Sequence, residues 1–170
     1  GIVVAGSTLS ATLTSVTAGD DNDNTLITGN TFFKLRYGIF TRGGSTANPN
    51  TGTVISNNII GPASFGVDEI GKSGILIREE TGALITGNEI RFVGGDFANT
   101  SAGSDRVGIC FGTDASWTPT AVYVTNTIVT KNNIHDVVDE RTFSAVGIII
   151  GGVDGTNPTN NIIANNTISG

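Results

Sequence analysis

A single histidine stands beside an acidic residue in this sequence, in the pair His135-Asp136. An imidazole that is oriented by a carboxylate is a common general base in enzymes. Asp139, Glu140 and Arg141 follow closely and would add charge around such a base. A lone histidine in a polar turn is also an ordinary structural residue. His135 and Asp136 are therefore candidates for acid–base catalysis, with a charged turn as the alternative.

A second set of charged residues stands at common distances after a recurring glycine. Arg42 and Arg78 follow that glycine by four residues, and Glu80 and Asp114 follow it by six, with Glu79 between. If the repeats stack in register, these side chains meet at one margin of a sheet. Paired carboxylates with an arginine can serve acid–base chemistry on a sugar. The alternative is a solvated cluster of salt bridges, which protein surfaces commonly carry.

An acidic stretch near the N-terminus contains Asp20, Asp21 and Asp23. Alternating oxygen ligands of this kind can bind Ca²⁺. Asp and Asn also favour turns without any metal, and Thr25 and Thr31 occupy the positions where an EF-hand loop has Gly and Glu. Ca²⁺ is thus the only cofactor that the sequence suggests, and a metal-free acidic turn is the alternative.

The elements that must position these residues are indicated by two short motifs that alternate along the chain. The first reads two aliphatic residues, a small polar residue, any residue, Asn, any residue, and then Ile or Phe. It occurs at 26–32, 54–60, 84–90, 128–134 and 162–168. The second is Gly-Ile followed by two mostly apolar residues, and it begins at positions 1, 38, 74, 108 and 147. Such self-similarity is typical of solenoids.

Each repeat is too short to bury its own apolar side. We therefore expect successive repeats to stack about 4.8 Å apart and to pair strand with strand in parallel sheets. The recurring asparagines would then stand in a row at one turn, where their amides can bond to one another. These asparagines are Asn30, Asn58, Asn88, Asn132 and Asn166. The predicted fold class is all-β, a solenoid of about five coils with three short strands each.

The two motifs resemble those of right-handed parallel β-helix proteins of the Asn-x-Ile repeat type, over essentially the whole chain. That pectate-lyase-like superfamily includes pectate lyases, polygalacturonases, alginate epimerases, phage tailspikes and many bacterial surface proteins. The resemblance implies a right-handed parallel β-helix in which residues 1–170 form one segment of a longer solenoid or multidomain protein, because neither end carries a recognisable cap. One fold hosts many activities, so the resemblance leaves the function open.

The third residue of the Gly-Ile motif should point away from the interior. These residues are Val3, Phe40, Leu76, Cys110 and Ile149. An outward apolar stripe is either covered by loops or a neighbouring domain, or it is a groove for a ligand or partner. Phe40 and Leu76 are therefore candidate ligand-binding residues. Trp117 and Tyr123, which flank one connection, are candidates for stacking on a sugar ring.

The charge balance narrows the range of partners. The net charge is −6 and the nine basic residues are scattered, so nucleic acid is not an expected partner. The longest apolar runs are far too short to cross a bilayer, so we expect no membrane span. Charged residues make up only 14% of the chain, whereas Gly, Thr and Asn are abundant.

We therefore expect a non-catalytic β-helical stalk or an adhesive, carbohydrate-binding segment of a secreted or cell-surface bacterial protein. The expected partners are a polysaccharide or glycan, flanking domains, and export or surface machinery. The alternative is a polysaccharide-active enzyme, a lyase, hydrolase or epimerase of the pectate-lyase-like superfamily. Convergence of charged residues from neighbouring coils in one cleft, within hydrogen-bond reach of one another, would favour the enzyme.

Overall fold

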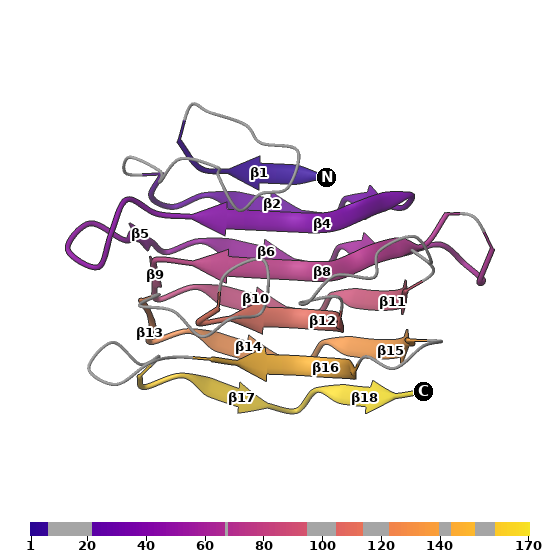
Figure 1. Cartoon of the computed structure of the whole chain (residues 1–170). Coiled ribbons are helices and arrows are strands. Elements are labelled where there is room, and N and C mark those ends of the chain that lie inside the picture. The colour runs from indigo at the N-terminus through magenta and orange to yellow at the C-terminus, as the bar shows by residue number, and fades with distance from the viewer. Residues whose placement is uncertain (7–21, 67, 95–104, 114–122, 140–143, 152–158) are drawn as a thin grey trace.

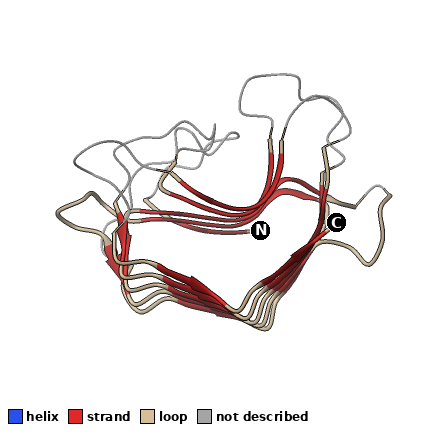
Figure 2. Ribbon diagram, turned by 90° about the horizontal axis from the view of Figure 1, so that it is seen from below, coloured by secondary structure: helices blue, strands red, loops and turns tan. Residues whose placement is uncertain are grey.

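The computed structural model describes residues 1–6, 22–66, 68–94, 105–113, 123–139, 144–151 and 159–170. Every regular element in these ranges is a β-strand, and the strands lie in successive layers from the N-terminus to the C-terminus (Figure 1). Seen along the stack, each layer is a bent ring of short strands joined by turns (Figure 2). The prediction of an all-β solenoid is confirmed at this level.

One sheet contains a strand from each copy of the asparagine motif. Its strands are β2 (Leu26–Thr28), β6 (Val54–Ser56), β10 (Leu84–Thr86), β14 (Ile128–Thr130) and β17 (Ile162–Ala164). All four pairings are parallel, and they join residues at equal positions of the motif, for example Ile55 with Ile85. The repeat seen in the sequence is therefore also the register of the sheet.

A ten-stranded sheet bends around the coil and contains the two other series of strands. The Gly-Ile motif lies in β1 (Ile2–Val4), β4 (Leu35–Arg42), β8 (Ile70–Arg78), β12 (Arg106–Phe111) and β16 (Ala145–Ile150). The end of the asparagine motif lies in β3 (Thr31–Phe32), β7 (Ile59–Ile60), β11 (Glu89–Val93), β15 (Asn133–Val137) and β18 (Thr167–Ser169). A third sheet consists of β5 (Asn50–Thr51), β9 (Glu80–Thr81) and β13 (Val124–Thr125).

The interior of the solenoid is a continuous column of aliphatic side chains. Ile55, Ile85 and Val129 from one sheet meet Ile90 and Ile134 from another, and all five are fully buried. Each layer alone would leave these side chains in water, so burial occurs only through stacking. Because isoleucine and valine are stiff at χ1 and favour extended backbone, the same residues both form the strands and fill the core.

The glycine of the second motif makes room for the isoleucine of the first. A Cβ atom at Gly74 would lie 2.6 Å from Cγ2 of Ile90, and one at Gly108 would lie 2.6 Å from Cγ2 of Ile134. The same relation holds at Gly38, where the distance to the corresponding isoleucine is 2.7 Å. The glycine of one motif and the isoleucine of the other thus form one packing contact, which explains why the two motifs occur together in each repeat.

The five motif asparagines form the predicted ladder. The Nδ2 group of each asparagine donates to Oδ1 of its counterpart in the next layer, at 2.9 or 3.0 Å in all four steps. That Oδ1 also accepts the backbone N–H of the preceding asparagine. A second Nδ2 hydrogen reaches a backbone carbonyl of the layer before, such as Ile55 for Asn88, at 3.0 Å. The amides are thus satisfied although Asn58, Asn88 and Asn132 are buried.

The outward apolar stripe forms a second, smaller cluster. Phe40, Leu76, Cys110 and Val107 are fully buried together, separate from the interior column. Val3, at the N-terminal end of the same stripe, is 39% exposed. Cys110 Sγ lies 3.0 Å from Thr113 Oγ1. Phe40 and Leu76 therefore have no solvent-accessible surface in this fold, which favours the covered alternative over an open groove.

Within the described ranges, no helix is long and apolar enough to span a membrane. This agrees with the short apolar runs of the sequence.

The ladder predicts the effect of removing one rung. Asn88→Ala deletes the acceptor of two buried donors on Asn58 and should lower the free energy of unfolding by about 2–4 kcal/mol. The neighbouring Asn133 has an exposed side chain, so Asn133→Ala should change stability by less than about 0.5 kcal/mol. Urea unfolding followed by circular dichroism measures both. Equal stabilities would contradict a structural role for the ladder.

The contact between the two motifs predicts a second effect. Gly108→Ala places a methyl group 2.6 Å from both Ile134 Cγ2 and the backbone oxygen of Gly147, so it should cost about 1–3 kcal/mol or more. Gly66→Ala is the matched control, because nothing lies within 4 Å of its Cβ position. The same unfolding measurement applies, and a neutral Gly108→Ala would show that the layers are not held at this spacing.

Candidate functional site

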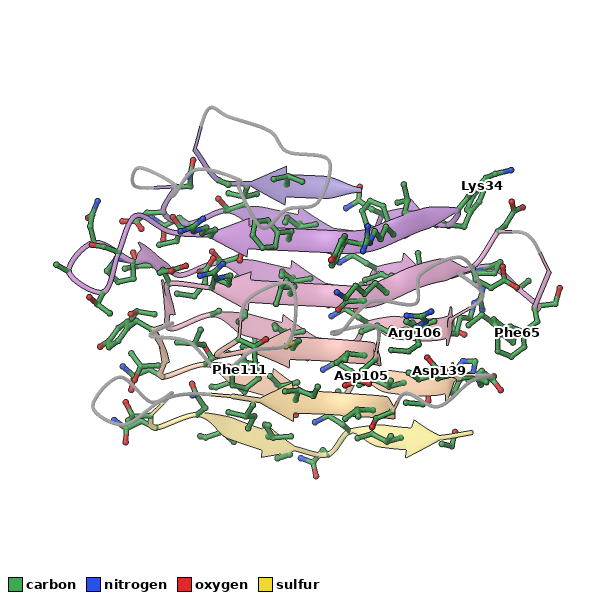
Figure 3. All side chains as sticks on the ribbon, viewed as in Figure 1. Lys34, Phe65, Asp105, Arg106, Phe111 and Asp139 are labelled. Atoms are coloured by element: carbon green, nitrogen blue, oxygen red, sulfur yellow. The ribbon has the colours of Figure 1, made fainter. Side chains whose placement is uncertain are left out.

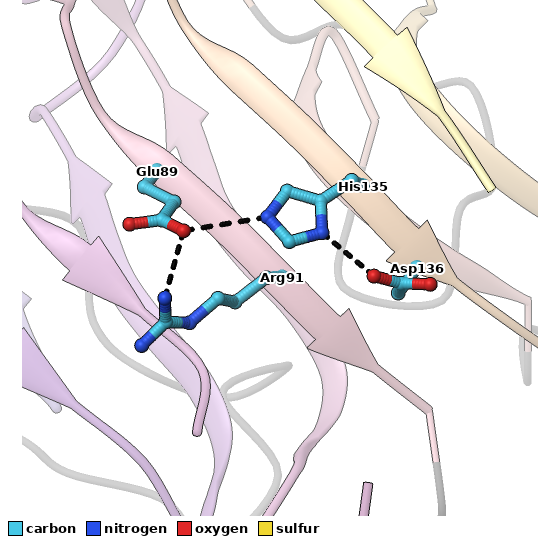
Figure 4. Close-up of polar contacts among 4 residues, drawn as sticks. All are labelled: Glu89, Arg91, His135 and Asp136. Atoms are coloured by element: carbon cyan, nitrogen blue, oxygen red, sulfur yellow. Dashed lines mark hydrogen bonds and ion pairs between the residues drawn. The ribbon is translucent and has the colours of Figure 1, made fainter. Parts of the chain in front are cut away.

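Four polar side chains meet on the outer face of two neighbouring strands. Glu89 and Arg91 belong to β11, and His135 belongs to β15 with Asp136 directly after it (Figure 4). In the parallel register Arg91 is the partner of His135. Ile90 and Ile134 point into the core, so the residues on either side of them point outward. We call Glu89, Arg91, His135 and Asp136 the histidine cluster.

The two carboxylates of the histidine cluster lie on opposite sides of the imidazole. His135 Nδ1 lies 2.7 Å from Asp136 Oδ2, and His135 Nε2 lies 3.4 Å from Glu89 Oε1. The same Glu89 oxygen accepts a hydrogen bond from Arg91 Nη1 at 2.7 Å. A neutral imidazole has one N–H, so only a doubly protonated ring donates to both carboxylates at once. The cluster is partly exposed, with side-chain exposures of 21% to 39%.

The ionisation of Glu89 follows from these contacts. Burial raises its pKa, but hydrogen bonds and charge from Arg91 and His135 outweigh that effect, and the net pKa is lowered. Glu89 is therefore a carboxylate at neutral pH. It holds Arg91 and His135 in place and is not a proton donor.

An unusual backbone conformation supports the cluster. Phe92 and Asp136 both have a left-handed backbone, with φ of 49° and 54°, and they occupy equal positions in adjacent layers. The Phe92 ring lies edge-on to His135 at 5.9 Å and to Phe65 at 4.7 Å. Phe65, at the outer rim of the solenoid, is 45% exposed (Figure 3). Lys34, which follows its ladder asparagine by the same four residues, has φ of 58°, so this conformation belongs to a turn that recurs in the repeat.

The sequence prediction identified half of the histidine cluster. His135 and Asp136 were candidates, and the structure places them together. Glu89 and Arg91 were missed, although a signal exists. Arg91 follows its ladder asparagine by three residues, as His135 does. A search for charges at equal offsets from the asparagine motif, and not only from the glycine motif, would have found the pair.

The second predicted group assembles in part. Glu79 lies between Arg42 and Arg78, with distances of 3.7 Å to Arg42 Nε and 3.5 Å to Arg78 Nη2. The two arginines are register partners on β4 and β8. Glu79 has a left-handed backbone with φ of 49°, and Glu80 does not join the group. The outcome is an ion-pair group with little exposed surface.

Glu80 lies on the other side of the chain, in the interior. It is fully buried in β9, and its Oε1 accepts a hydrogen bond from Asn50 Nδ2 at 3.1 Å. The hydroxyl groups of Thr41 and Thr53 lie near enough to favour its charged form, but neither bonds to Oε2 with good geometry. Burial dominates and raises the pKa of Glu80. Glu79 lies in the turn between β8 and β9 with a left-handed backbone, and this turn separates the directions of the two side chains.

Several predicted site residues cannot be placed. Asp114 and Trp117 lie outside the described residues, as do Asp20 and Asp21. Two others are described and have backbone roles. Asp23 Oδ1 accepts a hydrogen bond from the backbone N–H of Thr51 at 2.6 Å. The backbone carbonyl of Tyr123 accepts the N–H of Glu80 at 2.8 Å. Within the described ranges, no three His, Cys, Asp or Glu side chains are grouped as metal ligands.

One further ion pair is buried and structural. Arg106 Nε on β12 lies 3.9 Å from Asp139 Oδ2, and these side chains are only 4% and 2% exposed (Figure 3). Such pairs orient chain segments more than they stabilise them. The histidine cluster is therefore the described group that best combines exposure with convergent polar atoms.

Comparisons with protein-family models, with curated proteins and with solved structures find no match to this chain. The case for function therefore depends on the geometry of the chain itself.

The two glutamates predict opposite effects of pH. The raised pKa of Glu80 gives the folded state a stabilising proton that is fully present below the ordinary pKa of glutamate and is lost as pH rises through the folded value. Glu80→Gln should therefore raise stability at pH 7–8 and remove a slope of at most about 1.4 kcal/mol per pH unit. Urea unfolding from pH 4 to 8 measures this.

Glu89→Gln is the comparison variant. The lowered pKa of Glu89 contributes stability above the ordinary pKa of glutamate, and that contribution is lost as pH falls through the folded value. This variant should lose a little stability at neutral pH and keep the decline toward alkaline pH. A Glu80→Gln protein with the same decline in stability toward higher pH as the parent would contradict a raised pKa of Glu80.

Proposed function

We propose that this chain is part of a right-handed parallel β-helix of the pectate-lyase-like kind, in a secreted or cell-surface protein. In this proposal it acts as a rigid stalk with a non-catalytic glycan-binding face. Three features support the β-helix class: the parallel sheets, the stacked layers and the asparagine ladder. A right-handed coil is favoured because crossovers between parallel strands are right-handed in about 98% of cases.

The role as a stalk is supported by the way the layers are joined. Each layer pairs its backbone with the next, and the amides of Asn58, Asn88 and Asn132 bond to ladder asparagines on both sides. Bending the solenoid would break several of these bonds together. A composition that is rich in Gly, Thr and Asn and poor in charge resembles that of large exported surface proteins.

The glycan-binding role is supported chiefly by one observation. The histidine cluster combines exposed hydrogen-bonding groups with the exposed ring of Phe65, and Phe92 lies between them. Sugars offer hydroxyl groups to polar side chains and apolar faces to aromatic rings. The polar groups lie on the adjacent strands β11 and β15, and the exposed ring lies on the connection between β7 and β8.

Binding is favoured over catalysis because His135 is engaged on both sides. Each ring nitrogen faces a carboxylate oxygen, at 2.7 and 3.4 Å, so a substrate that uses His135 as a base must first displace one of the two carboxylates. The alternative is a polysaccharide lyase, hydrolase or epimerase. It is supported by the longer of these two contacts, the 3.4 Å distance between His135 Nε2 and Glu89 Oε1. A substrate hydroxyl could displace Glu89 from Nε2, while Asp136 orients the ring.

A glycan array with the full chain, with and without Ca²⁺, tests the proposal. We expect binding to one or more glycans and no new reducing ends or unsaturated products. His135→Ala should weaken binding about tenfold or more, because it removes a charge-assisted contact and releases both carboxylates. The control is Asn48→Ala, in the loop between β4 and β5 at the far end of the coil, which should leave binding unchanged (Figure 1).

Three other outcomes of these experiments would each contradict part of the proposal. Product formation that is lost in His135→Ala would make the chain an enzyme of the alternative class. Binding that is unaffected by His135→Ala would show that the glycan site lies elsewhere. No binding to any glycan would remove the adhesive part of the proposal and leave the stalk alone.

A further inference from the structure

We infer that the ligand of the histidine cluster is a neutral glycan and not a uronate, an inference that rests on the proposed glycan-binding role. The pairing of charges inside the cluster and the atoms that remain available for a ligand point to this class. Each carboxylate of the cluster has a second oxygen that can accept a hydrogen bond, and sugar hydroxyl groups are hydrogen-bond donors.

Each carboxylate uses only one of its oxygens inside the cluster. Glu89 Oε1 receives Arg91 and faces His135, and Asp136 Oδ2 faces His135. Among the described residues, none bonds to Glu89 Oε2 or to Asp136 Oδ1. Two carboxylate oxygens on either side of one imidazole can accept hydrogen bonds from two hydroxyl groups of a sugar, and such charge-assisted bonds are the stronger kind.

The charge of the cluster opposes an acidic ligand. Two carboxylates face one guanidinium and one imidazole, so the formal charge is −1 with a neutral His135 and zero with a protonated one. The whole chain carries −6. A uronate carboxylate would meet Glu89 and Asp136 with no surplus positive charge to compensate, and like charges at close range disfavour binding.

Arg91 does not supply the missing positive charge. Its Nη1 donates to Glu89 at 2.7 Å, and its Nε atom is buried. The bidentate recognition by which arginine binds carboxylates needs a fork of two free N–H groups. A uronate bound by Arg91 would share that guanidinium with the Glu89 carboxylate, and the two like charges would lie close together.

The aromatic residues beside the histidine cluster also favour a neutral glycan. Phe65 packs edge-on against Phe92, so its ring is held in place while 45% of its surface stays exposed. A fixed aromatic ring offers an apolar platform without adding charge. A neutral sugar can therefore place its apolar face on Phe65 and its hydroxyl groups on Glu89 and Asp136.

The experiment compares neutral and acidic glycans on the full chain by isothermal titration calorimetry. The neutral probes are oligosaccharides of glucose, galactose, mannose and xylose, and the acidic probes are oligogalacturonate and oligomers of alginate. In 20 mM salt we expect at least tenfold tighter binding of the best neutral probe. Raising the salt to 500 mM should narrow the difference, because it screens the repulsion of the acidic probes.

A charge-neutral double variant tests whether the two carboxylates cause the preference for neutral glycans. Glu89→Gln with Asp136→Asn keeps the shape and removes both negative charges, so neutral-glycan affinity should fall about tenfold and acidic-glycan affinity should rise. Asn48→Ala again serves as the control, and circular dichroism checks that the double variant is folded. Unchanged neutral and acidic affinities in a folded double variant would overturn the inference.

Two failures are distinguishable. Tighter binding of a uronate probe by the parent chain would overturn the neutral-ligand inference and leave the glycan-binding function standing. No binding of any probe in the calorimeter or on the array would overturn the function, and the inference would fall with it.

Discussion

The register between layers is the constraint on which the rest of this structure depends. In each step of the ladder, Nδ2 of one asparagine donates to Oδ1 of the next, so one layer can meet the next in only one alignment. A slip by a single residue would turn every core side chain to the outer face. Asn58, Asn88 and Asn132 hold this alignment from inside, where water cannot compete for their amides. The interior column and the outer clusters both follow from it.

Much of this fold was predictable because the chain repeats a local rule. The ladder positions, the parallel sheets and the two faces of the Gly-Ile strands all follow from motif spacing, and the structure confirms them. The reason for the alternation was not predictable. It depends on the close approach of Gly74 to Ile90 and of Gly108 to Ile134 across neighbouring layers, and spacing along the sequence does not show which residues approach across space.

The charged groups were harder to predict because each depends on which way one side chain points. Equal offsets placed Arg42, Arg78, Glu79 and Glu80 at one margin, but the left-handed backbone of Glu79, in the turn between β8 and β9, separates the last two. One glutamate lies between arginines, and its neighbour is buried beside Asn50 with a raised pKa. A sequence shows that two acids are adjacent, whereas their chemistry is set by the face that each one occupies.

The outer face carries different types of residue at equal positions in different layers. Inward positions are filled by Ile or Val in layer after layer, because each must match the layers on both sides. Outward positions on β11 and β15 have no such partner to satisfy, so Glu89, Arg91 and His135 can stand where other layers carry apolar or small residues. The rigid register fixes these side chains at the spacing of adjacent strands, about 4.8 Å. A repeated core of this kind therefore holds differing outer side chains at fixed spacing, and these outer side chains are the ones that can recognise a ligand.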